Sequence, residues 1–209
     1  ISSSWSPLQL NRSLVVDNGN NQNEGYGIYN PNNTSNINYS TIAGNTKHGI
    51  YGSSYSINVN SSIIYNNYRG GYQINSNGST INYSNIQNGQ AGISGGGSIY
   101  YNECISDNPE FIDDNYRVGF NSLTVDAANP NHEDINMPPG LGMIRADMGV
   151  YGGPGNDYWG GDTIPSGAPA VEHVQDLPQD QGGHVGIMYE ASVFDYAHTA
   201  YTIDHYSFW

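Results

Sequence analysis

The sequence predicts an all-β protein built as a parallel solenoid with about 22 residues in each coil. Three observations predict this fold class. Similar segments recur at a fixed period, their apolar residues form short groups without a helical period, and Gly, Asn and Ser are frequent between them. The recurring segments are SNINYSTIAGN (35–45), INVNSSIIYNN (57–67) and STINYSNIQNG (79–89). We therefore expect each coil to consist of two or three short strands joined by tight turns.

Four columns of the repeat keep their residue type across the three segments. Two are apolar, one is serine and one is asparagine: Ile37/Val59/Ile81, Ile42/Ile64/Ile86, Ser40/Ser62/Ser84 and Asn38/Asn60/Asn82. Stacked coils place like residues above one another, so the apolar columns should fill the interior. The Asn and Ser columns should lie at the bends, because Asn tolerates left-handed backbone angles and can hydrogen-bond along a stack. Strand alternation predicts that Tyr39 points inward together with Ile37.

The repeat continues imperfectly on both sides of these segments. SLVVDNG (13–19) is a partial first copy. SIYYNECISDN (98–108) is a shorter fourth copy, which places Ile99 and Cys104 in the two apolar columns. Cys104 is therefore expected to be a small core residue and not a nucleophile.

Three further segments carry a family resemblance: DNPEFIDDNYRV (107–118), SLTVDAANP (122–130) and RADMGVYGG (145–153). They resemble the run that closes many bacterial extracellular proteins of the right-handed parallel β-helix superfamily, the fold of pectate lyases. That run reads approximately D-P-x-F-x-D, S-x-x-I-D-A-G-x-P and R-x-D-x-G-A-Y-G-G. Here Asn108-Pro109 precedes Glu110, and Ala128 replaces the usual Gly. The resemblance implies a right-handed coil and a closing segment, and it implies no particular activity.

The chain is expected to contain two folded parts. Residues 1–155 should form the right-handed β-helix, with repeats over about 10–106 and the closing segment over 107–155. Residues 156–169 are rich in Gly and Pro, as a linker is. Residues 170–209 alternate apolar and polar positions and resemble the opening strands of a fibronectin type III-like β-sandwich. Such a sandwich needs about 100 residues, so we expect a partial, truncated sandwich and a longer parent chain.

Composition excludes several classes of protein. Five Lys and Arg residues oppose 19 Asp and Glu, giving a net charge of −14, so binding to nucleic acid is not expected. The sequence has no apolar run of about 18 residues, so no membrane span is expected. A single Cys excludes an intrachain disulfide framework. An acidic, Asn-rich and Lys-poor chain is typical of a secreted, extracellular or cell-surface protein.

Lys47 and Arg69 form the pair that suggests catalysis. The two are 22 residues apart, hence in one column of adjacent coils, and alginate and chondroitin lyases of this fold also use a stacked Lys and Arg. Those enzymes carry calcium-binding Glu residues just upstream, whereas residues 39–46 contain no carboxylate. The motif set of pectin-cleaving hydrolases is also missing, because Asp113-Asp114 lacks its N-T-D, G-H-G and R-I-K companions. We expect no catalytic residue; a polysaccharide lyase or glycoside hydrolase acting on acidic polysaccharide is the alternative.

No cofactor is expected, and Ca²⁺ is the one metal left open. Asp107, Glu110, Asp113 and Asp114 could hold it if their loop folded them together. No EF-hand or glycine-aspartate repeat supports such a site, and the six His residues show no metal-binding spacing.

The tyrosines indicate a function more clearly than the catalytic pair or the acidic loop does. Tyr29 and Tyr51 are one coil apart and each follows an inward Ile, so both should point outward, with Tyr55 near the same coils. Aromatic rings beside amides suit polyhydroxylated ligands, so we expect Tyr29, Tyr51, Tyr55 and the column Asn38/Asn60/Asn82 to bind a polysaccharide or cell-surface glycan. The expected function is a non-catalytic extracellular module for adhesion, surface scaffolding or glycan binding. A second alternative is a structural subunit of a filament or coat that self-associates through open coil edges.

Overall fold

A computed structural model describes residues 1–3, 6–19, 25–68, 72–119, 121–134 and 145–156, and the backbone of 170–176 and 185–190. The chain divides into two compact units, Ile1–Gly160 and Gly161–Trp209. Among the described residues there is no α-helix, and one short 3₁₀ helix, η1 (Gly89–Gly92), lies in the first unit.

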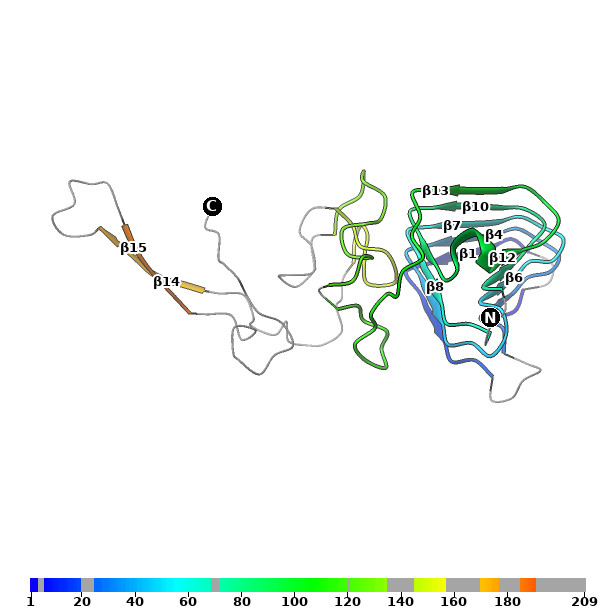
Figure 1. Ribbon diagram of the computed structural model, residues 1–209, viewed down its shortest axis with the longest axis horizontal. Helices are drawn as coiled ribbons and strands as arrows, with labels where there is room; N and C mark the ends of the chain where they lie inside the picture. The colour runs from blue at the N-terminus through cyan, green and yellow to red at the C-terminus, as the bar shows by residue number, and fades with distance from the viewer. Residues whose placement is uncertain are drawn as a thin grey trace. The chain divides into compact units, whose positions relative to one another are not determined.

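The first unit is a parallel β-solenoid whose strands form three sheets (Figure 1). The long sheet has the order β1 (Leu8–Asn11), β4 (Ser35–Asn38), β7 (Ile57–Asn60), β10 (Ser79–Asn82) and β13 (Ile99–Asn102). The second sheet has the order β11 (Asn85–Ile86), β8 (Ile63–Tyr65), β5 (Thr41–Ala43) and β2 (Leu14–Val16). The third sheet has the order β12 (Ile93–Ser94), β9 (Ile74–Asn75), β6 (Ile50–Tyr51) and β3 (Ile28–Tyr29).

The predicted repeat register is confirmed. In the long sheet Ile37 pairs with Val59, and Val59 pairs with Ile81. Hydrogen bonds between equivalent residues of these coils span 22 residues, as the sequence period requires. The first coil is longer, because Asn38 bonds to Asn11 across 27 residues, and the last is shorter, because Asn102 bonds to Asn82 across 20.

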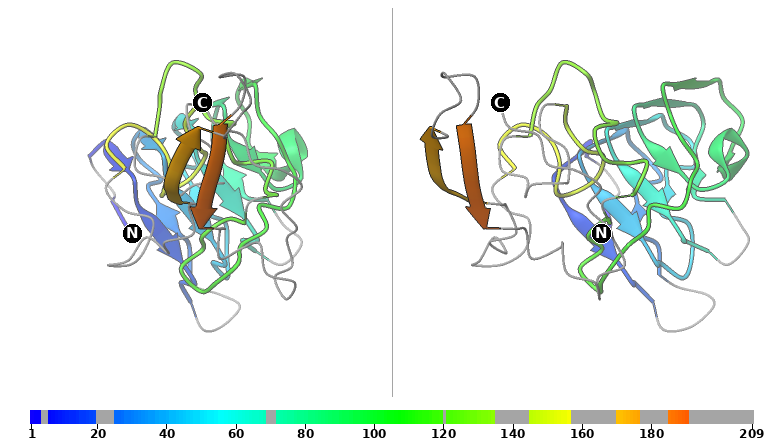
Figure 2. Two further views of the ribbon diagram at one scale, coloured as in Figure 1. Left: turned by 90° about the vertical axis from the view of Figure 1, so that its left-hand side faces the viewer. Right: turned by 60° about the vertical axis from the view of Figure 1, so that its left-hand side comes forward.

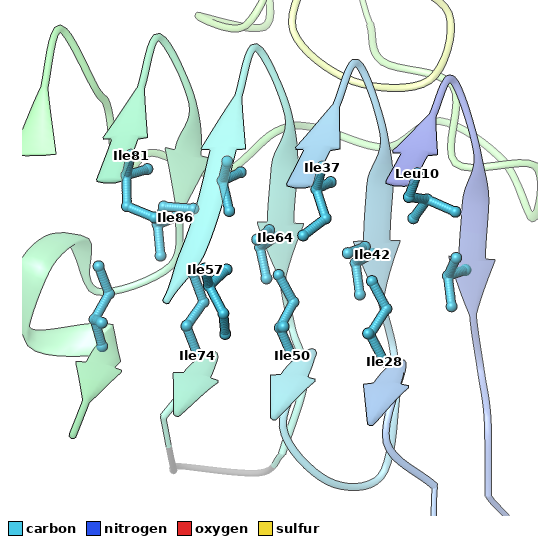
Figure 3. Close-up of a cluster of buried hydrophobic side chains, with 13 residues drawn as sticks. Leu10, Ile28, Ile37, Ile42, Ile50, Ile57, Ile64, Ile74, Ile81 and Ile86 are labelled. Carbon is cyan, nitrogen blue, oxygen red and sulfur yellow. The ribbon is translucent and has the colours of Figure 1, made fainter. Parts of the chain in front are cut away.

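The interior is filled by stacked aliphatic side chains. Figure 3 shows isoleucines from all three sheets pointing into one enclosed space, in rows that run from coil to coil. The fully buried residues of this core include Ile28, Ile37, Ile42, Ile50, Ile57, Ile64, Ile74, Ile81 and Ile86. Cys104 packs against this core while half-buried, as its place in the apolar column predicts. No single coil could enclose these side chains alone, so the coils stabilise one another.

The bend after each strand of the long sheet differs from the prediction. The left-handed residue is not the Asn of the column but the residue that follows it: Arg12, Tyr39, Ser61, Tyr83 and Glu103 have φ of 42°, 45°, 50°, 49° and 48°. Such a conformation costs a non-glycine residue about 1–2 kcal/mol. Hydrogen bonds compensate, because Ser62 donates from Oγ to the carbonyl of Asn60 and accepts the backbone N–H of Ser40.

The bend also corrects the expected direction of Tyr39. The left-handed turn ends the strand alternation, so Tyr39 does not join Ile37 in the interior. It belongs instead to a second buried cluster, on the outer face of the second sheet, together with Ile63, Val118, Ala146 and Met148.

The closing segment packs along the side of the coils. The backbone N–H of Gly149 donates to the carbonyl of Ser61 at 2.9 Å, and that of Val150 donates to Oγ1 of Thr41 at 3.1 Å. In Figure 1 these green and yellow loops lie beside the coil edge labelled β8. The second sheet is therefore covered on both faces, which explains why all three residues of β5 are buried.

The second unit contains one described pair of strands. β14 (Ala170–Asp176) and β15 (Val185–Glu190) are antiparallel, with an irregularity in register between Val171 and His173 (Figure 2). A two-stranded sheet does not define a sandwich, so the fibronectin-like domain and its truncation stay predictions.

Candidate ligand-binding site

Five aromatic rings gather at one corner of the solenoid, and we call them the aromatic cluster: Tyr26, Tyr29, His48, Tyr51 and Tyr68. Its centre is the predicted pair Tyr29 and Tyr51. They are partners in the parallel pairing of β3 with β6, so the sheet register sets one ring over the other. Their ring centroids are 5.3 Å apart and their planes differ by only 6°.

Tyr26 leans against this stacked pair. Its ring centroid lies 5.2 Å from those of both Tyr29 and Tyr51, with interplanar angles of 46° and 52°. The ammonium nitrogen of Lys47 lies 4.8 Å from the centroid of the Tyr26 ring, within the range of a cation–π contact. Positive charge is thus held at the edge of the cluster.

His48 connects the stacked pair to the exposed Tyr68. Its ring centroid lies 6.1 Å from that of Tyr51 and 5.3 Å from that of Tyr68. Nδ1 of His48 lies 2.7 Å from the carbonyl oxygen of Tyr72, so this nitrogen carries the proton and donates it. Tyr68 is 42% exposed and Tyr72 is 49% exposed, so aromatic surface remains open to a ligand beside the half-buried rings.

Sequence reasoning found Tyr29 and Tyr51 but missed Tyr26 and His48. The sequence does contain a signal for these two residues. Tyr26 and His48 are 22 residues apart and form an aromatic column of the repeat. Tyr55, the third predicted tyrosine, is 44% exposed and makes none of the ring contacts found among the described residues.

The predicted asparagine column forms a continuous side-chain ladder on the long sheet. Nδ2 of each residue donates to Oδ1 of the residue one coil earlier, along Asn102, Asn82, Asn60, Asn38 and Asn11, at 3.1, 2.9, 3.2 and 2.9 Å. A second amide pair runs beside it, from Asn58 to Asn36 at 2.7 Å. Each amide inside the ladder keeps one N–H and one lone pair for other partners.

The structure does not test the proposed catalytic pair, Lys47 and Arg69. Lys47 is half-buried and engaged with Tyr26, and Arg69 lies outside the described residues. Burial raises the pKa of Cys104, as expected for a thiol that packs against the core.

The four acidic residues of the predicted Ca²⁺ loop lie in the closing segment. Asp113 accepts the backbone N–H groups of Asn115 and Arg117 and pairs with the Arg117 guanidinium. Asp107, Glu110 and Asp114 are exposed. Within the described ranges, no group of three or more His, Cys, Asp or Glu side chains is arranged to hold a metal ion. Asp113 thus has a structural partner in Arg117.

The described part of the chain contains no helix with the length and apolar character that a membrane crossing requires. Comparisons of the whole chain with protein-family models, with curated proteins and with solved structures give no significant match.

Proposed function

We propose that this protein is a non-catalytic extracellular module that binds a polysaccharide at the aromatic cluster. The observation that carries the proposal is the stacking of Tyr29 on Tyr51, with Tyr26, His48 and Tyr68 around them. Sugars offer apolar C–H faces and many hydroxyl groups, and tyrosine offers an apolar ring with a polar tip.

The cluster has distinct parts for these two kinds of contact. The faces of Tyr29 and Tyr51 that meet are covered by each other, so their edges and phenolic oxygens are what a ligand meets. Tyr68 supplies exposed ring surface for stacking. The net charge of −14 repels polyanions, and Lys47 is already held over Tyr26, so a neutral glycan is favoured over an acidic one.

The rest of the solenoid suits a rigid support for the aromatic cluster. Parallel strands and the asparagine ladder fix the coils rigidly, so the rings are held in place before a ligand arrives and less entropy is lost on binding. Adhesion or surface display would use such a module.

The experiment is affinity electrophoresis of the whole chain in gels that contain neutral polysaccharides, or alginate, pectate and chondroitin. We expect retardation in a neutral glycan, weakened roughly fivefold in Tyr68→Ala, since stacking of one ring on a ligand is worth on the order of 1 kcal/mol. Tyr51→Ala should weaken it as well, because this change removes a ring edge and a phenolic oxygen from the centre of the cluster. Tyr100→Ala is the matched control, because Tyr100 is 63% exposed on β13, in a different sheet from Tyr29 and Tyr51. Retardation that the cluster variants leave unchanged would refute the proposed site.

Release of unsaturated sugar products, read by ultraviolet absorbance, tests the lyase alternative on the same mixtures. Product formation that disappears in Lys47→Ala would replace the binding module with an enzyme. If the chain shows neither retardation nor product release, and its light scattering grows with protein concentration, the filament alternative is favoured.

A further inference from the structure

Two buried carboxylates in the closing segment have no role in the aromatic cluster. Asp134 is 2% exposed and Asp147 is 1% exposed. Asp and Glu are almost never buried to this degree unless they are paired or bind a metal. Their burial therefore requires an explanation.

Each carboxylate has one oxygen engaged and one oxygen without a partner. Oδ2 of Asp134 accepts the backbone N–H of Asp147 at 2.6 Å, and Oδ1 of Asp147 accepts the backbone N–H of Asp126 at 2.7 Å. In the described part of the chain, no donor meets Asp134 Oδ1 or Asp147 Oδ2 at hydrogen-bond distance and angle, and both atoms are buried. The backbone N–H groups of Asp134 and Gly153 approach the Asp134 carboxylate and favour its charged form, so Asp147 Oδ2 is the more isolated of the two. Leaving one such atom unsatisfied destabilises the fold, and more so when the atom is charged.

The two arginines of the closing segment are committed to other partners. Arg145 donates from Nε and Nη2 to the carbonyls of Ala128 and Ala127. Arg117 pairs with Asp113. Burial, reinforced by the charges of Asp134 and Asp126, raises the pKa of Asp147 to about 8. Burial also raises the pKa of Asp134. Asp134 thus disfavours the charged form of Asp147 in this buried place.

We propose that Asp134 and Asp147 together bind one divalent hard cation, with Ca²⁺ as the favoured ion. Two carboxylates balance the charge of one divalent cation. The donors present are oxygens, which Ca²⁺ prefers, and backbone carbonyls and water complete the six to eight ligands that it takes in proteins. Oδ1 of Asp134 and Oδ2 of Asp147 supply the direct contacts to the ion. This site is separate from the exposed loop of Asp107, Glu110, Asp113 and Asp114.

Such an ion would tie two loops of the closing segment to each other beside the solenoid. Asp134 is close enough to Tyr39 for its charge to help raise the pKa of that phenol. Tyr39 in turn contacts His132, two residues before Asp134. A cation at the carboxylates would therefore hold together the loops that cover the second sheet.

The experiment is a calorimetric titration of the EDTA-treated and dialysed full chain with Ca²⁺, followed by thermal unfolding with and without the ion. We expect one saturable site and a higher midpoint temperature with Ca²⁺. Asp147→Asn and Asp134→Asn should each weaken the affinity roughly tenfold or more, because even residues that only support a metal ligand change affinity by about that factor. Asp114→Asn is the matched control and should leave the affinity unchanged, since Asp114 is an exposed acid of the same segment.

Hydrogen exchange of the wild-type chain tests the location without any substitution, in case the Asn variants do not fold. Ca²⁺ should slow exchange of the backbone N–H groups of Asp126 and Asp147, which donate to the two carboxylates. Absence of Ca²⁺ binding by the wild type would overturn the proposal. Binding that is lost in Asp114→Asn and retained in Asp147→Asn would overturn it as well, because it would place the ion in the surface loop.

Discussion

The phenolic oxygen of Tyr39 lies 2.6 Å from Nδ1 of His132, and this contact joins a bend of the solenoid to the closing segment. The two ring centroids are 5.8 Å apart. The backbone of Gly153 lies against the same ring, since a Cβ at that position would be 2.5 Å from Cδ1 of Tyr39. One side chain from the repeat is thus enclosed by two distant parts of the segment that covers it.

Tyr39→Phe should lower the free energy of unfolding by about 1 kcal/mol, because it removes this hydrogen bond and keeps the ring. Urea denaturation measures the change. Tyr83→Phe is the matched control, since Tyr83 occupies the same left-handed position of a later coil outside the second cluster, and it should change stability by less than about 0.5 kcal/mol. In a double-mutant cycle with His132→Ala, additive effects would contradict a direct contact.

Removing a buried amide should cost far more than removing an amide of the outer ladder. Asn67 is 2% exposed; its Oδ1 accepts two hydrogen bonds from Asn45, and its Nδ2 donates to the carbonyl of Ile42. Asn67→Ala leaves the buried backbone N–H of Asn45 without this acceptor and removes the donor to the Ile42 carbonyl, so we expect a loss of about 3 kcal/mol or more. Asn60→Ala should cost less than about 1 kcal/mol, because water can replace its contacts on the half-buried ladder. Urea denaturation of the two variants provides the comparison; equal losses would contradict it.

The interior should respond to lost volume as a close-packed core does. Ile64 is fully buried between two neighbouring coils. Ile64→Ala should lower the free energy of unfolding by about 2–5 kcal/mol, and Ile64→Val by about 0.5–1.5 kcal/mol. Chemical denaturation followed by circular dichroism measures both. A small effect of Ile64→Ala would mean that the coils collapse around the missing side chain.

The repeat made the solenoid predictable, and the reason is geometric. A column such as Ile42, Ile64 and Ile86 keeps one residue type because stacked coils give its members one environment. The same logic placed Tyr29 over Tyr51, and it would have found Tyr26 and His48 had the aromatic column been compared across coils.

Contacts that fall outside the repeat could not be predicted in this way. The direction of Tyr39 depends on a left-handed turn at its own position and on loops about 90 residues later in the chain, neither of which the alternation of strand residues encodes. In the sequence, Asp147 stands only within the closing pattern RADMGVYGG (145–153). Its burial, and the free oxygen that makes it a candidate ligand, arise from tertiary packing alone.

Stability should fall as the pH rises above about 10, partly because of Tyr101. Its phenol donates to the carbonyl of Ile105 at 3.2 Å, and burial, with a smaller effect of Cys104, raises its pKa to about 12. The unfolded tyrosine loses its proton near pH 10. Between about pH 10 and pH 12 the folded chain therefore binds more protons than the unfolded chain, so the free energy of unfolding decreases with pH.

Tyr101→Phe tests this assignment. Below pH 10 the variant should be less stable than the wild type by about 1 kcal/mol, because the hydrogen bond to Ile105 is lost. The difference should shrink as the pH approaches 12, because the wild type alone loses the contribution of this phenol. Some alkaline loss should remain in the variant, since burial also raises the pKa values of Tyr39 and Tyr116. Urea denaturation at several pH values gives the two curves, and curves that stay parallel through this range would assign the pH dependence to the other tyrosines.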